Sequence, residues 1–247
     1  MSKDKVLSHF KARAATYDQS SRWCTDSALL EKIRGVLSPG KDALILDTAC
    51  GTGLVGQTFK GRVKGVIGVD ITEEMYRQGR RHMDYFVHGS AEQLPFRSGV
   101  FDISLERQGI QFMDAGRAVP EMARVTRRGG TVCLVQLCAY GAEDRDEYFR
   151  ILKLRNPARR NFFVRGDLKA LLESAGCRDV KVHDFISEEN VDRWADNGAI
   201  GAENREEIRK IYQAASEGFN RYHAVKTGPS GHFIDKMLFG IAVGTVS

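Results

Sequence analysis

The chain has 247 residues, of which 42% are hydrophobic, and its 37 basic and 32 acidic side chains give a net charge of +5. This length suits one α/β domain with a large core and a small cap, and it excludes two full domains. The first residues lack a signal-peptide pattern, and no apolar stretch approaches the ~18 residues that a membrane span needs, so we expect a cytoplasmic protein without a span.

Cysteines and basic residues bear on the ligands of the protein. The five cysteines form no Cys-x-x-Cys pair, and Cys133 and Cys138 have no further zinc ligands nearby, so we expect reduced, mostly buried thiols and no metal. Basic clusters at 77–81, 124–128 and 155–160 suit an anionic partner, whether nucleic acid, acyl carrier protein or a carboxylated small molecule. The first two clusters are interleaved with acidic residues, as on solvated helix faces, and the third cluster has fewer acidic residues near it.

The hydrophobic pattern predicts alternating helices and strands. A short amphipathic helix at 6–18 precedes the core, and Asp26 with Ser27 could cap a helix whose apolar positions recur up to Leu37. Strands are then expected at 43–48, 64–70, 85–88, 101–106 and 130–138, with helices at 53–60, 72–82 and 114–126 between them. Mostly apolar strands separated by helices predict a parallel sheet covered on both faces.

The C-terminal part predicts a helix at 168–175, a strand at 177–186 and a last strand at 237–246. Because this last strand follows a non-helical crossover, we expect it to run antiparallel. The intervening excursion could form a lid over the carboxyl edge of the sheet, together with residues 140–165 and the N-terminal helix. We therefore expect one domain with an N-terminal helical lid at 1–40, a core at 41–188, a helical insert at 189–230 and the last strand within 231–247.

A glycine-rich turn follows the first core strand. Residues 47–53 read Asp-Thr-Ala-Cys-Gly-Thr-Gly, directly before a stretch that can begin a helix. Such a turn exposes backbone N–H groups at a positive helix terminus, with no Cβ to keep a ligand away, and we place a cofactor here. Gly51, Gly53 and Gly56 also satisfy the dinucleotide fingerprint, with Asp70 where an acid could hold a ribose, so NAD remains open at this point.

The same turn resembles the first motif of class I S-adenosylmethionine-dependent methyltransferases. Three further stretches resemble later motifs of that family, in order and at plausible spacing, at 66–70, 89–96 and 100–105, and the resemblance covers roughly residues 8 to 180. It implies a Rossmann-like, seven-stranded, mostly parallel sheet with an antiparallel last strand, helices on both faces and a small helical lid. It also implies S-adenosyl-L-methionine as cofactor and S-adenosyl-L-homocysteine as product, with an NAD-binding domain as the alternative.

The resemblance assigns roles around the turn. Backbone at Gly51 and Gly53 would line the methionine part of the cofactor, Asp47 would orient its ammonium group, and Asp70 would accept both ribose hydroxyls.

The adenine would be held further along the chain. Ile71 and Met75 could sandwich it, although core packing explains Met75 nearly as well. Ser90 stands in place of the family's usual acidic residue, so its hydrogen bond to adenine would be weak, and the backbone N–H of Ala91 is the better candidate. The candidate cofactor-binding residues are Asp47, Ala49, Gly51, Gly53, Asp70, Ile71, Met75, Ser90, Ala91, Glu92 and Arg107.

The run after the fourth strand bears on the methyl acceptor. Nucleic-acid and protein-amide methyltransferases place Asn or Asp with Pro-Pro-Tyr there, whereas this chain has Glu-Arg-Gln-Gly at 106–109, which argues against base N-methylation. Residues 107–112 instead resemble small-molecule members, including quinone-biosynthesis methyltransferases and the malonyl carrier-protein methyl-ester-forming enzymes of biotin synthesis. Residues 10–18 are similar to the N-terminal signature of the same groups, in which Tyr17 would close over the donor's carboxylate; Tyr17 could also anchor a helix on the core.

Few residues point directly to catalysis. His223, beside Tyr222 in the insert, is the histidine best placed to deprotonate a phenolic or thiol acceptor, although a packing histidine would look the same. Aromatic side chains could wall an acceptor pocket or pack in the core, and arginines, Arg159 among them, could pair with an acidic acceptor. The candidate catalytic residues are Tyr17 and His223, and the candidate substrate residues are Tyr148, Arg155, Phe162, Phe163, Arg165 and Trp194.

These residues support three functions. We expect methyl transfer to an oxygen or carbon of a small aromatic or quinone-like molecule. The candidate aromatic wall favours such an acceptor, and the chain lacks the Asn/Asp-Pro-Pro-Tyr motif that holds an amine. A malonyl carrier-protein carboxyl O-methyltransferase is the alternative within the enzyme class, favoured by the basic clusters and the N-terminal signature. A non-catalytic module that binds S-adenosylmethionine or RNA is the alternative outside it. The expected partner is a small-molecule acceptor, with a carrier protein as an alternative and no nucleic acid in the preferred interpretation.

Overall fold

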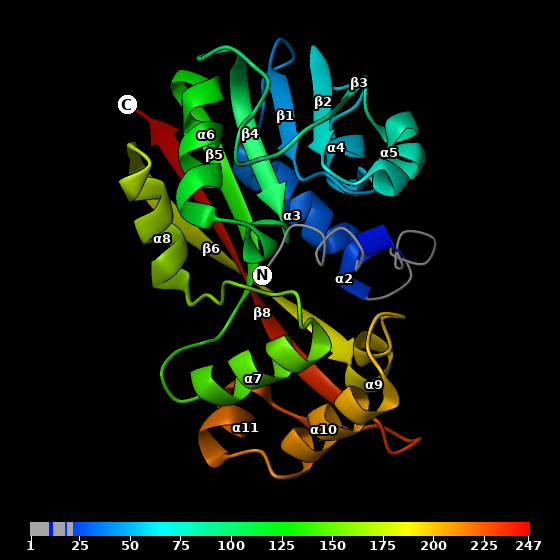
Figure 1. Ribbon diagram of the computed structural model, residues 1–247. Helices are drawn as coiled ribbons and strands as arrows, with labels where there is room; N and C mark the ends of the chain where they lie inside the picture. The colour runs from blue at the N-terminus through cyan, green and yellow to red at the C-terminus, as the bar shows by residue number, and fades with distance from the viewer. Residues whose placement is uncertain (1–9, 12–17, 19–21) are drawn as a thin grey trace.

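The computed structural model describes residues 10, 11, 18 and 22–247, and its centre is one sheet (Figure 1). Seven strands follow the order β3-β2-β1-β4-β5-β8-β6, and the short β7 pairs with β8. The strands are β1 (Leu44–Thr48), β2 (Gly65–Asp70), β3 (Tyr85–His88), β4 (Phe101–Arg107), β5 (Thr126–Cys138), β6 (Cys177–Asn190), β7 (Lys226–Thr227) and β8 (Phe233–Val246).

The strand directions confirm the sheet expected from the sequence. The strands β3, β2, β1, β4 and β5 pair in parallel, and β8 runs antiparallel to both of its neighbours, β5 and β6. The addition is β7, a two-residue strand on the extension of β8. All six residues of β2 are buried, which explains their apolar and β-branched character, because a parallel sheet is covered on both faces.

Helices cover both faces of the sheet. The side chains of α3 and α4 join one apolar cluster and those of α6 and α8 join another on the opposite face. The helical elements are α2 (Arg22–Thr25), α3 (Ser27–Leu37), α4 (Leu54–Gln57), α5 (Glu73–Gly79), η2 (Arg80–His82), η3 (Ile110–Phe112), α6 (Ala115–Val125), α7 (Arg145–Arg155), α8 (Arg165–Ser174), α9 (Val191–Ala195), α10 (Ala202–Gln213) and α11 (Glu217–His223). Asp26 caps α3 as predicted, since its carboxylate accepts from the backbone N–H of Ala28 at 2.9 Å.

Several of the predicted boundaries differ in the structure. Within the predicted helical insert at 189–230, α10 and α11 are separate helices, because Ser216 caps α11 by accepting from the backbone N–H of Phe219 at 3.1 Å. The helix expected over 53–60 is only the four-residue α4. The strand expected from 130 begins at Thr126, and its pairing with β4 is irregular near Gly129, which has φ +72°. The helix expected over 6–18 lies outside the described residues, apart from Phe10, Lys11 and Asp18.

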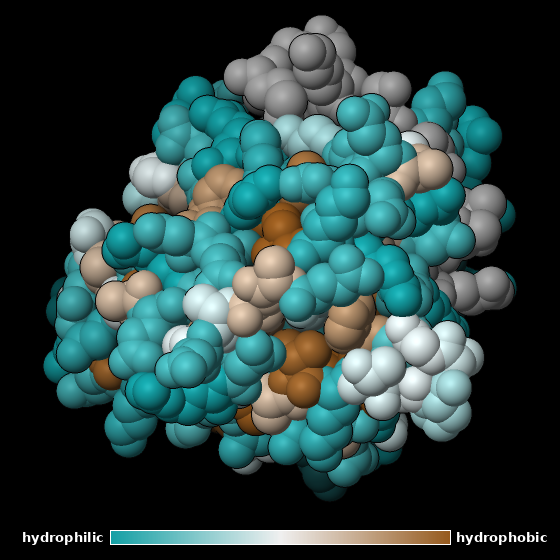
Figure 2. Space-filling view, turned by 90° about the horizontal axis from the view of Figure 1, so that it is seen from below, coloured by the Kyte–Doolittle hydropathy of each residue, from teal (hydrophilic) through white to brown (hydrophobic). Residues whose placement is uncertain are grey.

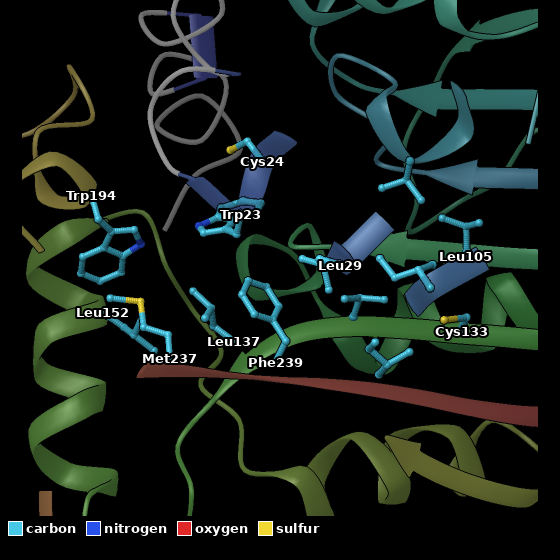
Figure 3. Packing of buried hydrophobic residues seen from close by; sticks show 14 of the residues in the cluster. Trp23, Cys24, Leu29, Leu105, Cys133, Leu137, Leu152, Trp194, Met237 and Phe239 are labelled. Carbon is cyan, nitrogen blue, oxygen red and sulfur yellow. The ribbon is translucent and has the colours of Figure 1, made fainter. Parts of the chain in front are cut away.

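Strands β6 and β8 extend beyond the parallel strands, and α7, α9, α10 and α11 pack around this extension (Figure 1). We call these four helices with the extended ends of β6 and β8 the helical end. One apolar cluster connects it to the sheet, as Figure 3 shows from Trp194 and Met237 through Phe239 to Leu105. The helical end and the parallel strands therefore share a core.

The outer face of the helical end is largely hydrophilic, with small apolar areas near its middle (Figure 2). Within the part of the chain that the structure describes, no helix combines the length and the apolar character that crossing a membrane requires. The five cysteines are free thiols, and only Cys50 is not fully buried.

Candidate active site

A pocket opens at the carboxyl ends of β1, β2 and β4. Seven of the predicted cofactor-binding residues line it: Asp47, Ala49, Gly51, Asp70, Ile71, Met75 and Arg107. Polar residues that the sequence interpretation had not selected, Thr52, Thr72 and Gln108, also belong to the wall, and their positions next to the motif residues were the available signal.

The turn after β1 is held in a left-handed backbone conformation. Ala49, Gly51 and Gly53 have φ values of +53°, +55° and +78°. The backbone N–H of Cys50 donates to the carbonyl of Val69 at 3.0 Å, which ties the turn to β2. Glycine adopts such angles without strain, and this explains why two of these positions are glycine.

Asp70 ends β2 and is buried, with an exposed fraction of 8%. Its Oδ2 accepts from the backbone N–H of Gly51 at 2.9 Å, and its Oδ1 accepts from that of Thr72 at 2.8 Å. Burial raises the pKa of Asp70, and these N–H donors partly offset the rise. Each carboxylate oxygen accepts one backbone hydrogen bond and retains a lone pair that can accept a ligand hydroxyl.

Asp47 lies in the same pocket and is more deeply buried. Burial raises its pKa to about 7, although the hydrogen bond that it accepts from the backbone N–H of Gly56 at 2.9 Å and the charge of Arg107 both lower it; the nearby charge of Asp70 adds to the rise. Two buried carboxylates with raised pKa values favour a ligand that carries positive charge. A sulfonium with an ammonium group fits this wall, whereas a dinucleotide pyrophosphate would be repelled by it.

Arg107 supplies the cation of the described pocket wall. Its guanidinium donates to the backbone carbonyl of Cys24 at 3.3 Å and lies 5.3 Å from the ring centre of Trp23. The backbone N–H of Trp23 in turn donates to Glu189 of β6 at 3.0 Å. Arg107 therefore joins the pocket to α2, and the hydrogen bond between Trp23 and Glu189 joins α2 to the helical end.

Comparison with known proteins identifies the family. The model of a family described as methyltransferase domain matches residues 46–134. A malonyl-[acyl-carrier protein] O-methyltransferase of Geobacter sulfurreducens is 31% identical over 202 residues, covering 73% of this chain and 72% of that protein. The chain belongs to the class I S-adenosylmethionine-dependent methyltransferases. S-Adenosylmethionine is the cofactor of this family, and the resemblance read from the four motifs is confirmed.

Other similar proteins agree on the fold. The crystal structure of the YcgJ protein from Bacillus subtilis superposes with a TM-score of 0.80 at 21% identity, covering 88% of this methyltransferase and 97% of that chain. A malonyl-[acyl-carrier protein] O-methyltransferase of Buchnera aphidicola is 30% identical over 135 residues, which is 53% of each chain. The alignment thus spans about half the length of the first curated relatives.

Four predicted cofactor residues lie outside the pocket wall of this methyltransferase: Gly53, Ser90, Ala91 and Glu92. The Oε1 of Glu92 accepts from the backbone N–H of Asp114 at 2.9 Å and so supports the start of α6. Ser90 pairs with Gln93 in an isolated bridge, and its hydroxyl accepts from the backbone N–H of Glu92 at 3.3 Å. Their contact with adenine stays a prediction.

The structure corrects the prediction that His223 is a catalytic base. Its imidazole is fully buried, with Nδ1 2.7 Å from Asp235 and Nε2 3.0 Å from Asp144. Burial disfavours the charged imidazole, but the two carboxylates outweigh it and raise the pKa of His223 to about 9. A protonated ring with both nitrogens bonded cannot accept a proton, and His223 instead joins α11 to β8 and to the loop before α7. The other catalytic candidate, Tyr17, lies outside the described residues.

The predicted acceptor residues of α7 and α9 are part of the core. Tyr148 and Trp194 have no exposed surface. Arg155 is buried, and its Nε donates to the carbonyl of Trp194 at 2.9 Å while its guanidinium lies 4.4 Å from the indole centre. Arg155 thereby connects α7 with α9, and Tyr148 packs against Phe219 and His223 of α11. All three side chains are absent from the pocket wall in the described part of the chain. Helical spacing could not show which face of α7 is turned inward.

The remaining acceptor candidates lie around α8. Phe163 is buried, and the ring centre of the half-buried Phe162 lies 5.2 Å from that of Phe149. Both candidates border a shallow surface groove that is separate from the cofactor pocket. Arg165 is exposed and donates to Asp184 of β6 at 2.8 Å. The structure therefore does not bring the six predicted acceptor residues together at the cofactor pocket.

Three described residues of the N-terminal segment touch the edge of the pocket. The ring of Phe10 lies 4.9 Å from that of Phe112, edge to face, and both rings line the pocket. Asp18 accepts from the hydroxyl of Thr52 at 2.6 Å, and Lys11 lies 3.2 Å from Glu74. These contacts place the described part of the N-terminal segment beside the cofactor pocket.

Proposed function

We propose that this methyltransferase forms a methyl ester on the free carboxylate of a small acyl thioester, with a malonyl group on a carrier protein as the acceptor. The observation that carries this proposal is the chemistry of the pocket wall. Its ionisable side chains, among the described residues, are Asp47, Cys50, Asp70 and Arg107. A carboxylate acceptor is already ionised at neutral pH and needs no general base, whereas a phenol with a pKa of about 10 does.

The residues of the wall can perform this reaction by positioning. S-Adenosylmethionine, when bound, supplies a methyl group that its sulfonium has already activated. Asp70 would hold the ribose hydroxyls and Asp47 the ammonium group, while Phe10 and Phe112 would exclude water. The new bond joins a carboxylate oxygen to the methyl carbon as the sulfur–carbon bond breaks, so no proton changes place. The contacts of the N-terminal segment support the further proposal that it is part of the lid.

The names of the relatives support the acceptor class. The proteins from Geobacter sulfurreducens and Buchnera aphidicola are both named malonyl-[acyl-carrier protein] O-methyltransferase. The third basic cluster offers less to an acidic carrier than the sequence indicated, because Arg155 and Arg159 are buried and Arg160 alone of its three arginines is exposed.

A second acceptor class is favoured by one specific observation. The pair formed by Phe10 and Phe112, with Met113 beside it, gives one side of the pocket an apolar and aromatic wall. Such a wall would also accept a small aromatic or quinone-like molecule, the acceptor first expected from the sequence.

Mass spectrometry of the acceptor can separate the two classes. The protein is incubated with S-adenosylmethionine and either malonyl carrier protein or a small hydroquinone. We expect the carrier-bound malonyl group to gain the mass of one methylene and to become resistant to decarboxylation, with no change in the hydroquinone. Methylation of the hydroquinone alone would replace the first proposal by the second. If neither acceptor changes and calorimetry detects no S-adenosylhomocysteine binding, the proposal of methyl transfer fails.

A further inference from the structure

Arg159 is a buried cation whose hydrogen-bond partners are all neutral. Its exposed fraction is 3%, and burial lowers its pKa to about 10. The Nε donates to the backbone carbonyl of Asn161 at 3.0 Å, and the guanidinium lies 5.4 Å from the ring centre of Phe162. No carboxylate of the described residues forms an ion pair with it, although an unpaired buried charge is costly.

A chain of two amides connects Arg159 to the cofactor pocket. One terminal nitrogen of Arg159 donates to Oε1 of Gln111 at 3.4 Å, and Nε2 of Gln111 donates to Oε1 of Gln108 at 3.0 Å. A guanidinium can only donate, so the atom of Gln111 that faces it must be oxygen. The nitrogen of Gln111 then faces Gln108, which in turn must present its oxygen. Arg159 thereby fixes the orientation of both amides.

The end of this chain is a donor at the pocket wall. Gln108 lines the pocket, and its buried Nε2 has no hydrogen-bond partner among the residues that the structure describes. Its position is strictly held, because its φ is +59° and its backbone N–H donates to Val135 of β5 at 3.0 Å. An unpaired buried donor is destabilising, and a bound ligand that offers an oxygen would remove that cost.

The place of Gln108 in the sheet indicates which ligand it meets. It follows β4, which is separated from β2 and Asp70 by β1, so the two sites are two strand spacings apart, roughly 10 Å. Arg107, in the same wall, offers a full charge for the carboxylate of the methyl donor. Gln108 is thus available to contact the methyl acceptor, on the side of the pocket away from the ribose site.

We propose that Gln108 recognises the acceptor's carboxylate, by donating from Nε2 to the oxygen that is not methylated, and that Arg159 is the positioning residue that keeps this amide turned as a donor. This inference rests on the proposed function. The positive charge of Arg159 also balances an acceptor anion in a pocket that already holds Asp47 and Asp70.

Calorimetry with two small thioesters tests the recognition. The protein is saturated with S-adenosylhomocysteine and titrated with malonyl-N-acetylcysteamine or acetyl-N-acetylcysteamine, which differ in the carboxylate. We expect wild-type protein to bind the malonyl thioester about tenfold or more tighter, as a charge-assisted hydrogen bond provides. In Gln108→Glu this preference should disappear, because glutamate still accepts from Gln111 but presents an oxygen to the acceptor. Each variant is first titrated with S-adenosylhomocysteine, so that a change in its affinity for this molecule is measured separately and the thioesters are compared at saturation.

Variants of the arginines test the positioning role. Arg159→Met should reduce the preference to about threefold or less because the amides are free to turn, and Arg159→Lys, which keeps a donor and a charge, should restore part of it. Arg160→Met, the neighbouring exposed arginine, should leave the preference unchanged. Equal wild-type affinity for the two thioesters, or a preference that survives Gln108→Glu, would overturn the inference. Failure of the wild-type protein to bind S-adenosylhomocysteine would be seen in the first titration, and would contradict the proposed function instead.

Discussion

The cofactor pocket and the helical end are held together in different ways. In the pocket, the two buried acids are bonded to backbone N–H groups close by in the sequence: Asp47 to Gly56 and Asp70 to Gly51 and Thr72. At the helical end, His223 is bonded to the side chain of Asp144, which is 79 residues away. The first region is therefore a local backbone motif that leaves polar groups for a ligand, and the second is a long-range side-chain network.

The cofactor pocket and the helical end also differ in how their buried charges are paired. The pocket acids have raised pKa values, and no cationic side chain of the described residues is bonded to them, so they can accept a cationic ligand. At the helical end two carboxylates share one internal cation, because the imidazolium of His223 lies between Asp144 and Asp235, and the hydroxyl of Tyr212 donates to Asp235 at 2.5 Å. Ligand binding should depend on the first set of charges and stability on the second.

Removing His223 from the network with Asp144 and Asp235 should have the largest effect on stability. His223→Gln leaves two carboxylates buried without a cation, so the free energy of unfolding in urea should fall by about 3–5 kcal/mol. Affinity for S-adenosylhomocysteine should stay within about twofold under native conditions. The matched control is His183→Gln on β6, where the half-buried ring has no hydrogen bond among the described residues, and it should change stability by about 0.5 kcal/mol or less. Equal destabilisation by both variants would contradict a special role for His223.

The same network should make stability depend on pH. The pKa of His223 is about 9 in the folded protein, above the value of about 6.5 expected when unfolded. Its contribution is therefore fully present below about pH 6.5 and is lost as the pH rises through about 9, by about 3 kcal/mol in all. Urea unfolding between pH 6 and 9.5 should show wild-type protein losing stability relative to His223→Gln. Parallel curves for the two proteins would show that the imidazole is not charged.

A substitution in the pocket should have the smallest effect on stability and a clear effect on binding. Asp70→Asn removes the charge and one acceptor, and we expect S-adenosylhomocysteine to bind about tenfold more weakly, while the free energy of unfolding changes by about 1 kcal/mol or less. Asp84→Asn is the matched control, because Asp84 also accepts from a backbone N–H of β2, that of Val66 at 2.8 Å, but is exposed outside the pocket. Unchanged affinity in Asp70→Asn would remove Asp70 from the binding site.

The sequence predicted much of the pocket wall because the relevant signals are local. The apolar run before Asp47, the glycines after it and the acid that ends β2 all lie within a short stretch. The parallel sheet and the antiparallel β8 followed from the alternation of elements and from the motif resemblance.

The helical end was not predictable in the same way. Nothing near His223 in the sequence indicates that Asp144 and Asp235 meet it, and Trp194 and Tyr148 have the same spacing whether they face a pocket or a core. Arg159 shows the limit most clearly: its cluster was visible in the sequence, but its lack of a carboxylate partner and its link to Gln108 depend on three segments brought together by folding.

The stretch 191–233 connects Asn190 of β6 with Ile234 of β8, and these two residues are register partners in neighbouring strands. Because the two ends of this stretch already lie side by side, its length can change without altering the pairing of β6 with β8. The fold thus allows this stretch to vary while the parallel strands that carry the cofactor pocket keep their register.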